Sequence, residues 1–377
     1  MRAPRGRGHP LAEGISALSQ GSFLTATGEL THDERVKLGG VEISLDGLDV
    51  AIAETPIAAD SNIDKRMDWR FLDLRRPEQN LVFRVQTTLE HALRTYWVDN
   101  DFIELHTTKL TASASESNAE LFEVKYFEGT AFLAQSPLFF KQMAQPAGFG
   151  KVSEVGPASR ADPSFASRHA TEFASVDAEV SWIDSLEDVM NLHEDLLVAG
   201  LTAVKAKHGD EVLRADDDMD PEGERQIPTY VAEVLGHAFV FLTDYASSIR
   251  PFHHMRHDDD PSTTKSYDLI FNGVEISTGA QREHRIEVLE QQTRDRGSTP
   301  WELGFYSTFF HYGVPPHGGF GMGLSRVLML LLHQSNLREV TYLFRGPTRL
   351  LPWSRGAPFG RSRRSLRQRD HSCASGG

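Results

Sequence analysis

The sequence predicts an α+β fold built around a mostly antiparallel β-sheet. Predicted strands and helices follow one another without the regular strand–helix alternation that is typical of parallel sheets. The segment from Thr171 to Trp182 alternates apolar and polar side chains, which indicates a strand with one packed and one polar face. The chain has 377 residues, of which 40% are hydrophobic. It can therefore bury a substantial core, in one large domain or two unequal ones.

The composition excludes several classes of protein. The formal net charge is −14, which gives no bulk attraction to nucleic acid, so such a partner would need a local basic surface. The single cysteine, Cys373, excludes a disulfide framework and a thiolate metal site. No run of about 20 apolar residues occurs, and the basic N-terminus lacks the apolar stretch of a secretory signal. We therefore expect a cytoplasmic protein without a membrane segment.

The first 75 residues predict three regions that precede the main domain. Residues 1–20 are rich in Gly, Pro and Arg and are expected to be disordered. Residues 22–57 predict three short strands separated by Gly and Asp turns, a β-unit too short to close a barrel by itself. A polar stretch at 60–73 predicts a linker or hinge. We assign the β-unit to 21–59 and the linker to 60–75.

The main domain is predicted for 76–352 and begins with an amphipathic helix over 81–98. The apolar residues of this helix recur at three- and four-residue steps, and they are Val82, Val85, Leu89, Leu93 and Trp97. A strand is expected at 102–107, and a hairpin around Glu128-Gly129. A second long helix is expected over 185–208.

The C-terminal half predicts further helices and strands. An acidic, solvated loop at 215–224 precedes a helix that runs into a strand over 227–241. Two strands with a turn at Asn272-Gly273 are expected within 266–283. Residues 314–332 predict a Pro/Gly-rich turn that leads into a buried apolar helix, and the Arg-rich segment 353–377 is expected to be disordered.

Two arginines lie on either side of a short loop in "GPASRADPSFASRHATEF", residues 156–173. Arg160 and Arg168 each present a fork of donors that fits phosphate or carboxylate, so together they could grip a polyphosphate. The alternative is a pair of surface ion pairs with Asp162 and Glu172.

A second candidate anion site is "GGFGMGLSRV", residues 318–327. Glycines let a backbone pass close to a ligand, and the helix that follows presents its N-terminus to an anion. Arg326, beside apolar residues, needs a carboxylate or a bound phosphate as partner. The alternative is a glycine-rich turn that packs against a core helix.

Three further segments carry side chains suited to ions. Glu275 and Thr278 offer oxygen ligands for a divalent cation, and Arg282 fits a carboxylate, although an ordinary polar strand face is the alternative. Lys141 follows an apolar pair, so it is expected to project from the end of a packed strand towards a site. "HHMRHDDD" (253–260) matches no standard zinc spacing and is predicted to be a solvated loop.

Together and in this order, these segments resemble class II aminoacyl-tRNA synthetases, most closely the archaeal-type, non-discriminating aspartyl-tRNA synthetases. "FIELHTTKL" is similar to motif 1 of that family, the segment with the two arginines to motif 2, and "GGFGMGLSRVLML" to motif 3. The resemblance implies a class II catalytic domain, in which helices flank an antiparallel sheet of seven strands that binds ATP. It also implies a homodimer formed through motif 1 and a partial anticodon-binding OB-type unit in 21–59. The implied activity is aspartate activation with ATP and Mg²⁺ to aspartyl-adenylate, followed by transfer to tRNA.

The resemblance also implies roles for individual residues. The expected catalytic residues are Arg160, at the α-phosphate, and Arg326, at the γ-phosphate. The expected ATP-binding residues are Arg160, Asp162, Arg168, His169, Glu275, Gly323 and Arg326. The expected Mg²⁺ ligands are Glu275 and Thr278.

The expected aspartate-binding residues are Glu116, Gln135, Ser136, Lys141 and Arg282. Lys141 and Arg282 correspond to the pair that binds the side-chain carboxylate in the family. Two cations that face one carboxylate would also reject asparagine, because an amide brings no negative charge.

The sequence departs from the family's pattern at several of these positions. The departures are Thr108 in place of a proline, Ser117-Asn118 in place of two glycines, Leu138 in place of a glutamine and Ser325 in place of a glutamate. Because of these departures, one alternative function stays open: a catalytically weak ATP-binding regulatory module. The incomplete β-unit leaves open an amino-acid-activating paralogue whose acceptor is not tRNA. The Arg-rich segment 353–377 could contact phosphates or serve only solubility.

Overall fold

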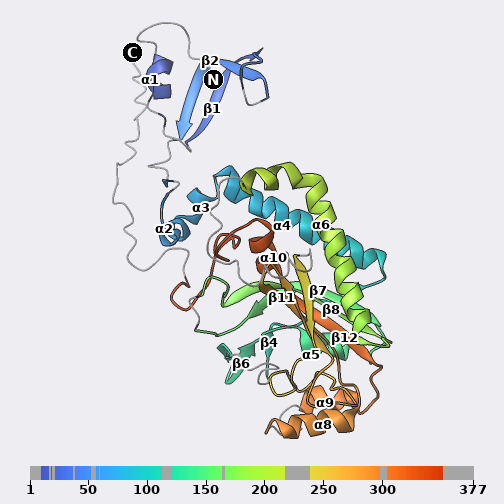
Figure 1. The fold of residues 1–377 in the computed structure, drawn as a ribbon. Helices are drawn as coiled ribbons and strands as arrows, with labels where there is room; N and C mark the ends of the chain where they lie inside the picture. Colours follow the sequence, from blue (N-terminus) through green and yellow to red (C-terminus); the bar gives the residue numbers. More distant parts are fainter. Residues whose placement is uncertain are drawn as a thin grey trace, which may run out of the picture.

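The centre of the molecule is a seven-stranded sheet with the strand order β3-β7-β8-β12-β11-β10-β9 (Figure 1). The computed structural model describes residues 10–16, 18, 22–36, 39–51, 57–58, 60–112, 120–163, 166–216, 238–297 and 304–350. The strands are β3 (Ile103–Glu104), β7 (Lys151–Ser159), β8 (Glu172–Ser181), β12 (His317–Gly323), β11 (Val274–Gln281), β10 (Ser266–Phe271) and β9 (Phe239–Thr243). Every neighbouring pair except β3 and β7 is antiparallel. The predicted α+β fold with a mostly antiparallel sheet is confirmed.

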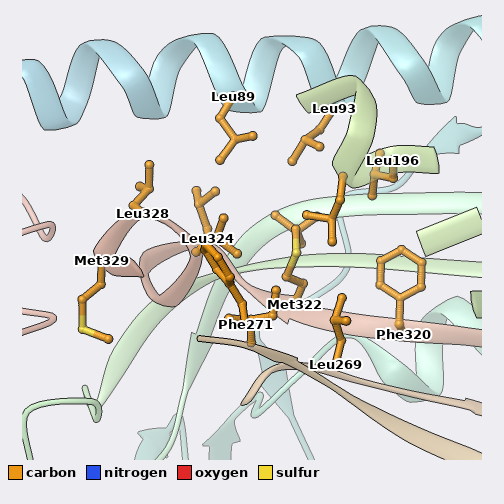
Figure 2. Close-up of a cluster of buried hydrophobic side chains, with 14 of the residues drawn as sticks. Leu89, Leu93, Leu196, Leu269, Phe271, Phe320, Met322, Leu324, Leu328 and Met329 are labelled. Carbon is orange, nitrogen blue, oxygen red and sulfur yellow. The ribbon is translucent and has the colours of Figure 1, made fainter. Parts of the chain in front are cut away.

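Two long helices, α4 (Pro77–Asp99) and α6 (Leu186–Asp216), lie side by side over one face of the sheet (Figure 1). Proline occupies the first turn of α4, where its missing N–H costs nothing. The five apolar residues predicted for the buried stripe of α4 are all buried. Figure 2 shows Leu89 and Leu93 above sheet residues such as Phe320 and Met322. The predicted helix is confirmed, and its apolar face forms one layer of the main core.

Helix α10 (Leu324–Leu331) extends the same core at the end of β12. The hairpin of β10 and β11 turns at Asn272-Gly273, as predicted, and both turn residues have positive φ. The apolar face of β8 packs towards the helices through Val176 and Ala178. The exception is Trp182, predicted for that packed face. It lies just beyond the strand, adopts a positive φ and is exposed.

A smaller lobe surrounds the start of helix α5 (Leu138–Met143). A three-stranded sheet of β4 (Leu110–Thr111), β6 (Gly129–Leu133) and β5 (Glu123–Tyr126) leads into it, and β5 and β6 form the predicted hairpin. Helices α8 (Ile286–Asp295) and α9 (Gly304–Phe310) close a second apolar cluster. The buried members of that cluster are Leu138, Phe139, Leu289, Tyr306, Phe310 and Val314.

The N-terminal β-unit is a hairpin of two long strands, β1 (Phe23–His32) and β2 (Val41–Ala51). The prediction of three short strands is wrong, because the expected turn at Asp46-Gly47 is an irregularity inside β2. Thr27 pairs with Gly47 and Gly28 with Leu45, so Asp46 is the extra residue of a bulge. The segment predicted to be disordered contains a short helix, α1 (Pro10–Ser16). Disorder is therefore the wrong prediction for that part.

The predicted linker at 60–75 is helical and packed, so a flexible linker is the wrong description. It contains α2 (Ile63–Asp68) and α3 (Arg70–Asp73). Arg70 and Asp73 are buried, and Arg70 donates to the carbonyl oxygens of Glu339 and Thr341. The charged side chains of this stretch form buried ion pairs, so the stretch is not a solvated hinge.

The glycine-rich segment at 317–323 is also different from its prediction, because it is the central strand β12 and not a turn. Close neighbours require glycine at two of its positions: a Cβ on Gly319 would lie 2.1 Å from the carbonyl oxygen of Ala178, and a Cβ on Gly318 would lie 2.9 Å from that of Ala280. The expected strand at 102–107 is only two residues long.

The acidic loop predicted at 215–224 begins inside α6, and the rest of it lies outside the described residues. The same is true of most of the expected helix at 227–241 and of the segment 353–377. None of the helices that the structure describes is long and apolar enough to span a membrane.

Candidate active site

A cavity of about 340 Å³ lies over the polar face of the central sheet, between β8, β11, β12 and the loops at their ends. Its wall includes all predicted site residues that the structure describes. From the ATP group these are Arg160, Asp162, Arg168, His169, Glu275, Gly323 and Arg326, and from the aspartate and metal groups Gln135, Ser136, Lys141, Arg282 and Thr278. Glu116 lies outside the described residues.

The loop with the two arginines closes one end of the cavity. Strands β7 and β8 pair up to Ser159 and Glu172, and the N–H of Arg160 then donates to the carbonyl oxygen of Thr171 at 2.9 Å. The Arg160 guanidinium lies over the Phe173 ring, with 5.3 Å between its carbon and the ring centroid. Its buried Nε has no hydrogen-bond partner among the described residues. The arginine is therefore held by stacking and retains a donor for an anion.

Arg326 reaches the same cavity from the first turn of α10. Its Nη1 donates to the backbone oxygen of Glu275 at 2.9 Å and lies 3.5 Å from the carboxylate of the same residue. The predicted need for a carboxylate partner is met in part, since this side chain is still 24% exposed. An anion in the cavity can reach the exposed part of the guanidinium.

Next to Arg326 lie three side chains whose oxygen atoms could bind a hard cation: Asp268, Glu275 and Thr278. The Thr278 hydroxyl donates to Asp268 at 2.8 Å and lies 3.3 Å from a carboxylate oxygen of Glu275. Asp268 was not predicted for this group. Mg²⁺ binds proteins through one or two carboxylates and keeps its remaining positions for water and phosphate oxygens. This donor set fits that ion, although no cluster of three or more His, Cys, Asp and Glu ligands occurs within the described parts of the chain.

The opposite end of the cavity has a floor of four alternating charges. Lys141 Nζ lies 2.9 Å from Asp177 Oδ1 and 3.4 Å from Glu179 Oε2. Arg282 donates through Nε to Glu179 at 3.0 Å and through Nη2 to the carbonyl oxygen of Gly319 at 3.1 Å. Burial alone would raise the pKa of Glu179, but Arg282 and Lys141 more than offset it, so the pKa lies below its usual value. The Glu179 carboxyl group is therefore charged at neutral pH.

This pairing corrects the charge argument made from the sequence. Lys141 and Arg282 contribute two positive charges, and Asp177 and Glu179 neutralise both. The pair does not present an excess of positive charge to a ligand. Both groups can only donate hydrogen bonds, and both are fixed in place by the two carboxylates. Lys141 Nζ is held in addition by the carbonyl oxygens of Ala178 at 3.2 Å and Phe320 at 2.7 Å.

Two histidines predicted to lie in a solvated loop are buried in the cavity wall, so that prediction is wrong for 253–255, whereas 258–260 are exposed as predicted. His253 and His254 are held by the bond from Met255 N to the Gln281 carbonyl and by the bridge between His254 and Arg282. Burial and the nearby cationic groups lower the pKa of both well below the usual value, so both are neutral. The Nδ1 atoms of both have no partner among the described residues.

Sequence reasoning missed several wall residues, and some could have been found. Asp177 and Glu179 lie on the face of β8 that the alternation predicted to be polar, and period 2 was the available signal. The histidines follow Phe252 and precede Met255, apolar residues that argue against a solvated loop. No local signal indicated Arg250, whose guanidinium stacks on Tyr245 at 3.8 Å and pairs with Asp268 at 2.8 Å. Burial and Asp268 raise the pKa of Tyr245 to about 12, so its hydroxyl stays protonated.

A mostly antiparallel sheet, with arginines from one loop and from the first turn of a helix at one end of a cavity, is the arrangement that the sequence resemblance implied for a class II synthetase. The family model for class II tRNA synthetases (D, K and N) matches residues 62–345. The chain belongs to this family, and the resemblance seen in the sequence motifs is confirmed.

Individual relatives make the comparison more specific. The aspartate–tRNA(Asp) ligase of Pyrococcus abyssi is 37% identical, over 90% of this chain and 86% of the relative. The aspartate–tRNA(Asp/Asn) ligase of Aeropyrum pernix is 38% identical, over 83% of this chain and 80% of the relative. Among solved structures, the asparaginyl-tRNA synthetase of Pyrococcus horikoshii in complex with asparaginyl-adenylate superposes with a TM-score of 0.82 at 25% identity, and covers 92% of this chain and 87% of its own.

Proposed function

We propose that this protein is an aspartate–tRNA ligase, which activates aspartate with ATP and transfers it from aspartyl-adenylate to the 3′ end of tRNA. The observation that carries the proposal is the single cavity whose wall contains the predicted ATP-binding, aspartate-binding and metal-binding side chains of the described chain. Its phosphate end and its carboxylate end lie over the same sheet face, as a reaction between the two substrates requires. The names of the relatives, at 34–38% identity, support the same reaction.

At the phosphate end, the arginines position the triphosphate and stabilise charge. An α-carboxylate oxygen of aspartate attacks the α-phosphorus, a new P–O bond forms, and the bond to the leaving pyrophosphate breaks. Negative charge grows on the α-phosphoryl oxygens, where the Arg160 guanidinium, fixed by Phe173, can donate. Arg326 would hold the outer phosphate. Mg²⁺ held by Glu275 and Thr278 would neutralise phosphate charge.

At the other end, the donors of Lys141 and Arg282 would bind the side-chain carboxylate of aspartate. Neither group can accept a hydrogen bond. An asparagine amide would place its own N–H₂ against these donors, so a donor would face a donor where a carboxylate oxygen would accept a hydrogen bond. Asp177 and Glu179 hold the two donors in position, so rejection of asparagine depends on donor geometry and not on net charge.

Pyrophosphate exchange measures the proposed reaction directly. Aspartate, and no other amino acid, is expected to support ATP–pyrophosphate exchange, and the purified protein is expected to charge tRNA(Asp). Arg160→Ala is expected to lower exchange about a hundredfold or more, because it removes a charged donor at the reacting phosphate. Arg294→Ala, which removes an exposed arginine paired with Glu290 on α8, is the control and should be nearly neutral.

The outcomes separate the proposal from the alternatives left open by the sequence. Exchange with no amino acid would overturn aspartate activation and leave an ATP-binding module. Exchange with aspartate without charging of any tRNA would point to another acceptor. No contact among the described residues favours either alternative. Leu138 does place an apolar side chain in the cavity wall, and it belongs to the cluster with Leu289 and Tyr306.

We also propose a homodimer in the cytoplasm, formed through α4 and β3. Val98 at the end of α4 and Ile103 in β3 are 69% and 44% exposed, and such apolar side chains favour contact with a second copy. Light scattering should give twice the mass of the chain, and Val98→Glu should shift the population towards the monomer. A monomeric wild type at micromolar concentration would contradict this part of the proposal.

A further inference from the structure

A buried group of charges joins the segment before α4 to the segment that follows α10. Asp73 lies at its centre, with its side chain fully buried and paired with Arg66, Arg70 and Arg76. Arg66 also pairs with Glu339, which lies 273 positions later in the chain. We call these five residues the Asp73 cluster. Burial alone would raise the pKa of Asp73, but the arginines more than offset it, so the pKa lies below its usual value.

The Asp73 cluster fixes the segment 336–346 at several points. Arg66 Nη1 donates to the Glu339 carboxylate at 2.7 Å, and Arg70 Nη2 donates to the backbone oxygens of Glu339 and Thr341 at 2.6 and 3.1 Å. A further ion pair joins Arg338 to Asp64 in α2. Side chain and backbone of the segment are therefore both anchored to α2 and α3.

The same segment holds the loop that carries two predicted ATP-binding residues. At one end of the loop, the carbonyl oxygen of Ser167 accepts a hydrogen bond from the N–H of Leu337 in the segment, at 2.8 Å. At the other end, the N–H of Thr171 donates to the carbonyl oxygen of Arg345 in the segment, at 3.3 Å. Arg168 and His169 lie between these two bonds, and both line the cavity. The Leu337 side chain is part of the same cavity wall. A shift of the segment would therefore move the loop.

We propose that the Asp73 cluster is a positioning device for ATP: it fixes segment 336–346 and, through it, the phosphate-binding side chains of loop 166–171. The inference deepens the proposed function and rests on it. Buried ion pairs are often no more stabilising than apolar residues of the same volume, so packing alone does not require five charged groups here. Their arrangement does give a fixed geometry, because guanidinium forks bind carboxylates and carbonyl oxygens in defined directions.

Glu339→Gln tests this role with little change of shape. Glu339 pairs with Arg66 and not with Asp73, so its substitution leaves the three ion pairs of Asp73 in place. The expected result is an ATP dissociation constant about ten times higher by calorimetry, with aspartate affinity within twofold of the wild type, because the loop contacts only the phosphate end. Amide hydrogen exchange within 166–171 should become faster, a readout that does not depend on catalysis.

Two further variants separate positioning from a loss of stability. Arg66→Lys keeps the charge but loses the fork, so it should also weaken ATP binding while the fold is retained. Thr88→Val removes the buried bond between Thr88 and His208, which joins α4 to α6 far from the segment in sequence. It should lower the melting temperature and leave ATP affinity unchanged.

The outcomes are distinct. A wild type that binds no ATP would overturn the proposed function and the inference with it. A wild type that binds ATP, with Glu339→Gln unchanged in ATP affinity or equally weakened for aspartate, would overturn the inference alone.

Discussion

Gly319 lies next to the buried charges of Glu179 and Arg282 at one end of the cavity. It pairs with Glu179 across β12 and β8, and its carbonyl oxygen accepts from Arg282. A Cβ at this position would lie 2.1 Å from the carbonyl oxygen of Ala178 and 2.3 Å from Oε2 of Glu179. The absence of a side chain therefore allows the two strands and the carboxylate to approach closely.

Gly319→Ala is expected to destabilise the protein by about 3 kcal/mol, because a backbone oxygen cannot move aside without separating the strands. Gly323→Ala is the matched control in the same strand, since its Cβ would meet only the Arg326 side chain at 3.7 Å or more. Urea unfolding of both variants measures the difference. Equal stability of the two variants would contradict the argument.

Single residues of the site were predictable where their chemistry is specific and not where contacts decide. The guanidinium forks of Arg160 and Arg168 favoured a shared anion site over surface ion pairs only together with the other motifs, and both arginines do line one cavity. The neutralisation of Lys141 and Arg282 by carboxylates on β8 was not visible, because a period-2 pattern assigns a face but not a partner. Which arginine meets which carboxylate is determined by strand order, which the sequence does not state.

At the scale of elements, α4 depends on the burial of one stripe. Leu89 and Leu93 are fully buried, and a Cβ on Gly200 of α6 would lie within 3.0 Å of both side chains. The two helices therefore approach closely at this point, and little space remains around the leucines. The packed stripe, more than helix propensity, stabilises the element.

Leu93→Ala is expected to lower the free energy of unfolding by about 2–5 kcal/mol, through lost burial and the cavity it leaves. Thr95→Ala, two residues along the same helix, removes an exposed side chain whose hydroxyl donates to the His91 carbonyl oxygen. It should change stability by less than about 0.5 kcal/mol. Thermal unfolding of both variants checks the contrast, and a Leu93→Ala protein as stable as Thr95→Ala would refute the packing argument.

Elements with a strong period or a specific turn dipeptide were predicted correctly, whereas two other glycine-containing segments, β12 and the middle of β2, were not. The stripe of α4 and the turn at Asn272-Gly273 each have one physical interpretation. Glycine has several, because it permits turns, bulges and close contact between strands. The glycines of β12 allow close contact, and Gly47 lies beside a bulge, yet both segments were predicted to contain turns. Tertiary neighbours decided between these interpretations.

Within the described parts of the chain five histidines are buried, and burial lowers the pKa of four of them: His193, His253, His254 and His317. Burial lowers the pKa of His193 to about 3 and that of His317 to about 4. The other two lie well below the usual value. His193 stacks on Phe320 in the core, with 3.9 Å between ring centroids, and its Nδ1 lies 3.0 Å from the Tyr267 hydroxyl.

These histidines predict that stability falls as soon as the pH drops below about 6.5, the unfolded pKa of histidine. Below that pH the unfolded chain binds protons that the native protein does not, so the free energy of unfolding decreases as pH decreases. Each histidine contributes on the order of 1 kcal/mol at pH 5.5, so the four together contribute several kcal/mol. That loss is comparable to the whole stability of many domains. The depressed pKa values of Asp73 and Glu179 act only at lower pH, below about 4.5.

Urea unfolding at pH 8, 7, 6 and 5.5 measures this dependence, and His193→Gln identifies one of its sources. The substitution keeps a polar partner for Tyr267 but removes one titrating group, so the slope between pH 6 and 5.5 should fall by about a quarter. Any constant loss from poorer packing shifts the curve without changing that slope, which makes the slope the decisive quantity. A slope unchanged in His193→Gln, or a wild type equally stable at pH 8 and 5.5, would show that the buried imidazoles do not control acid unfolding.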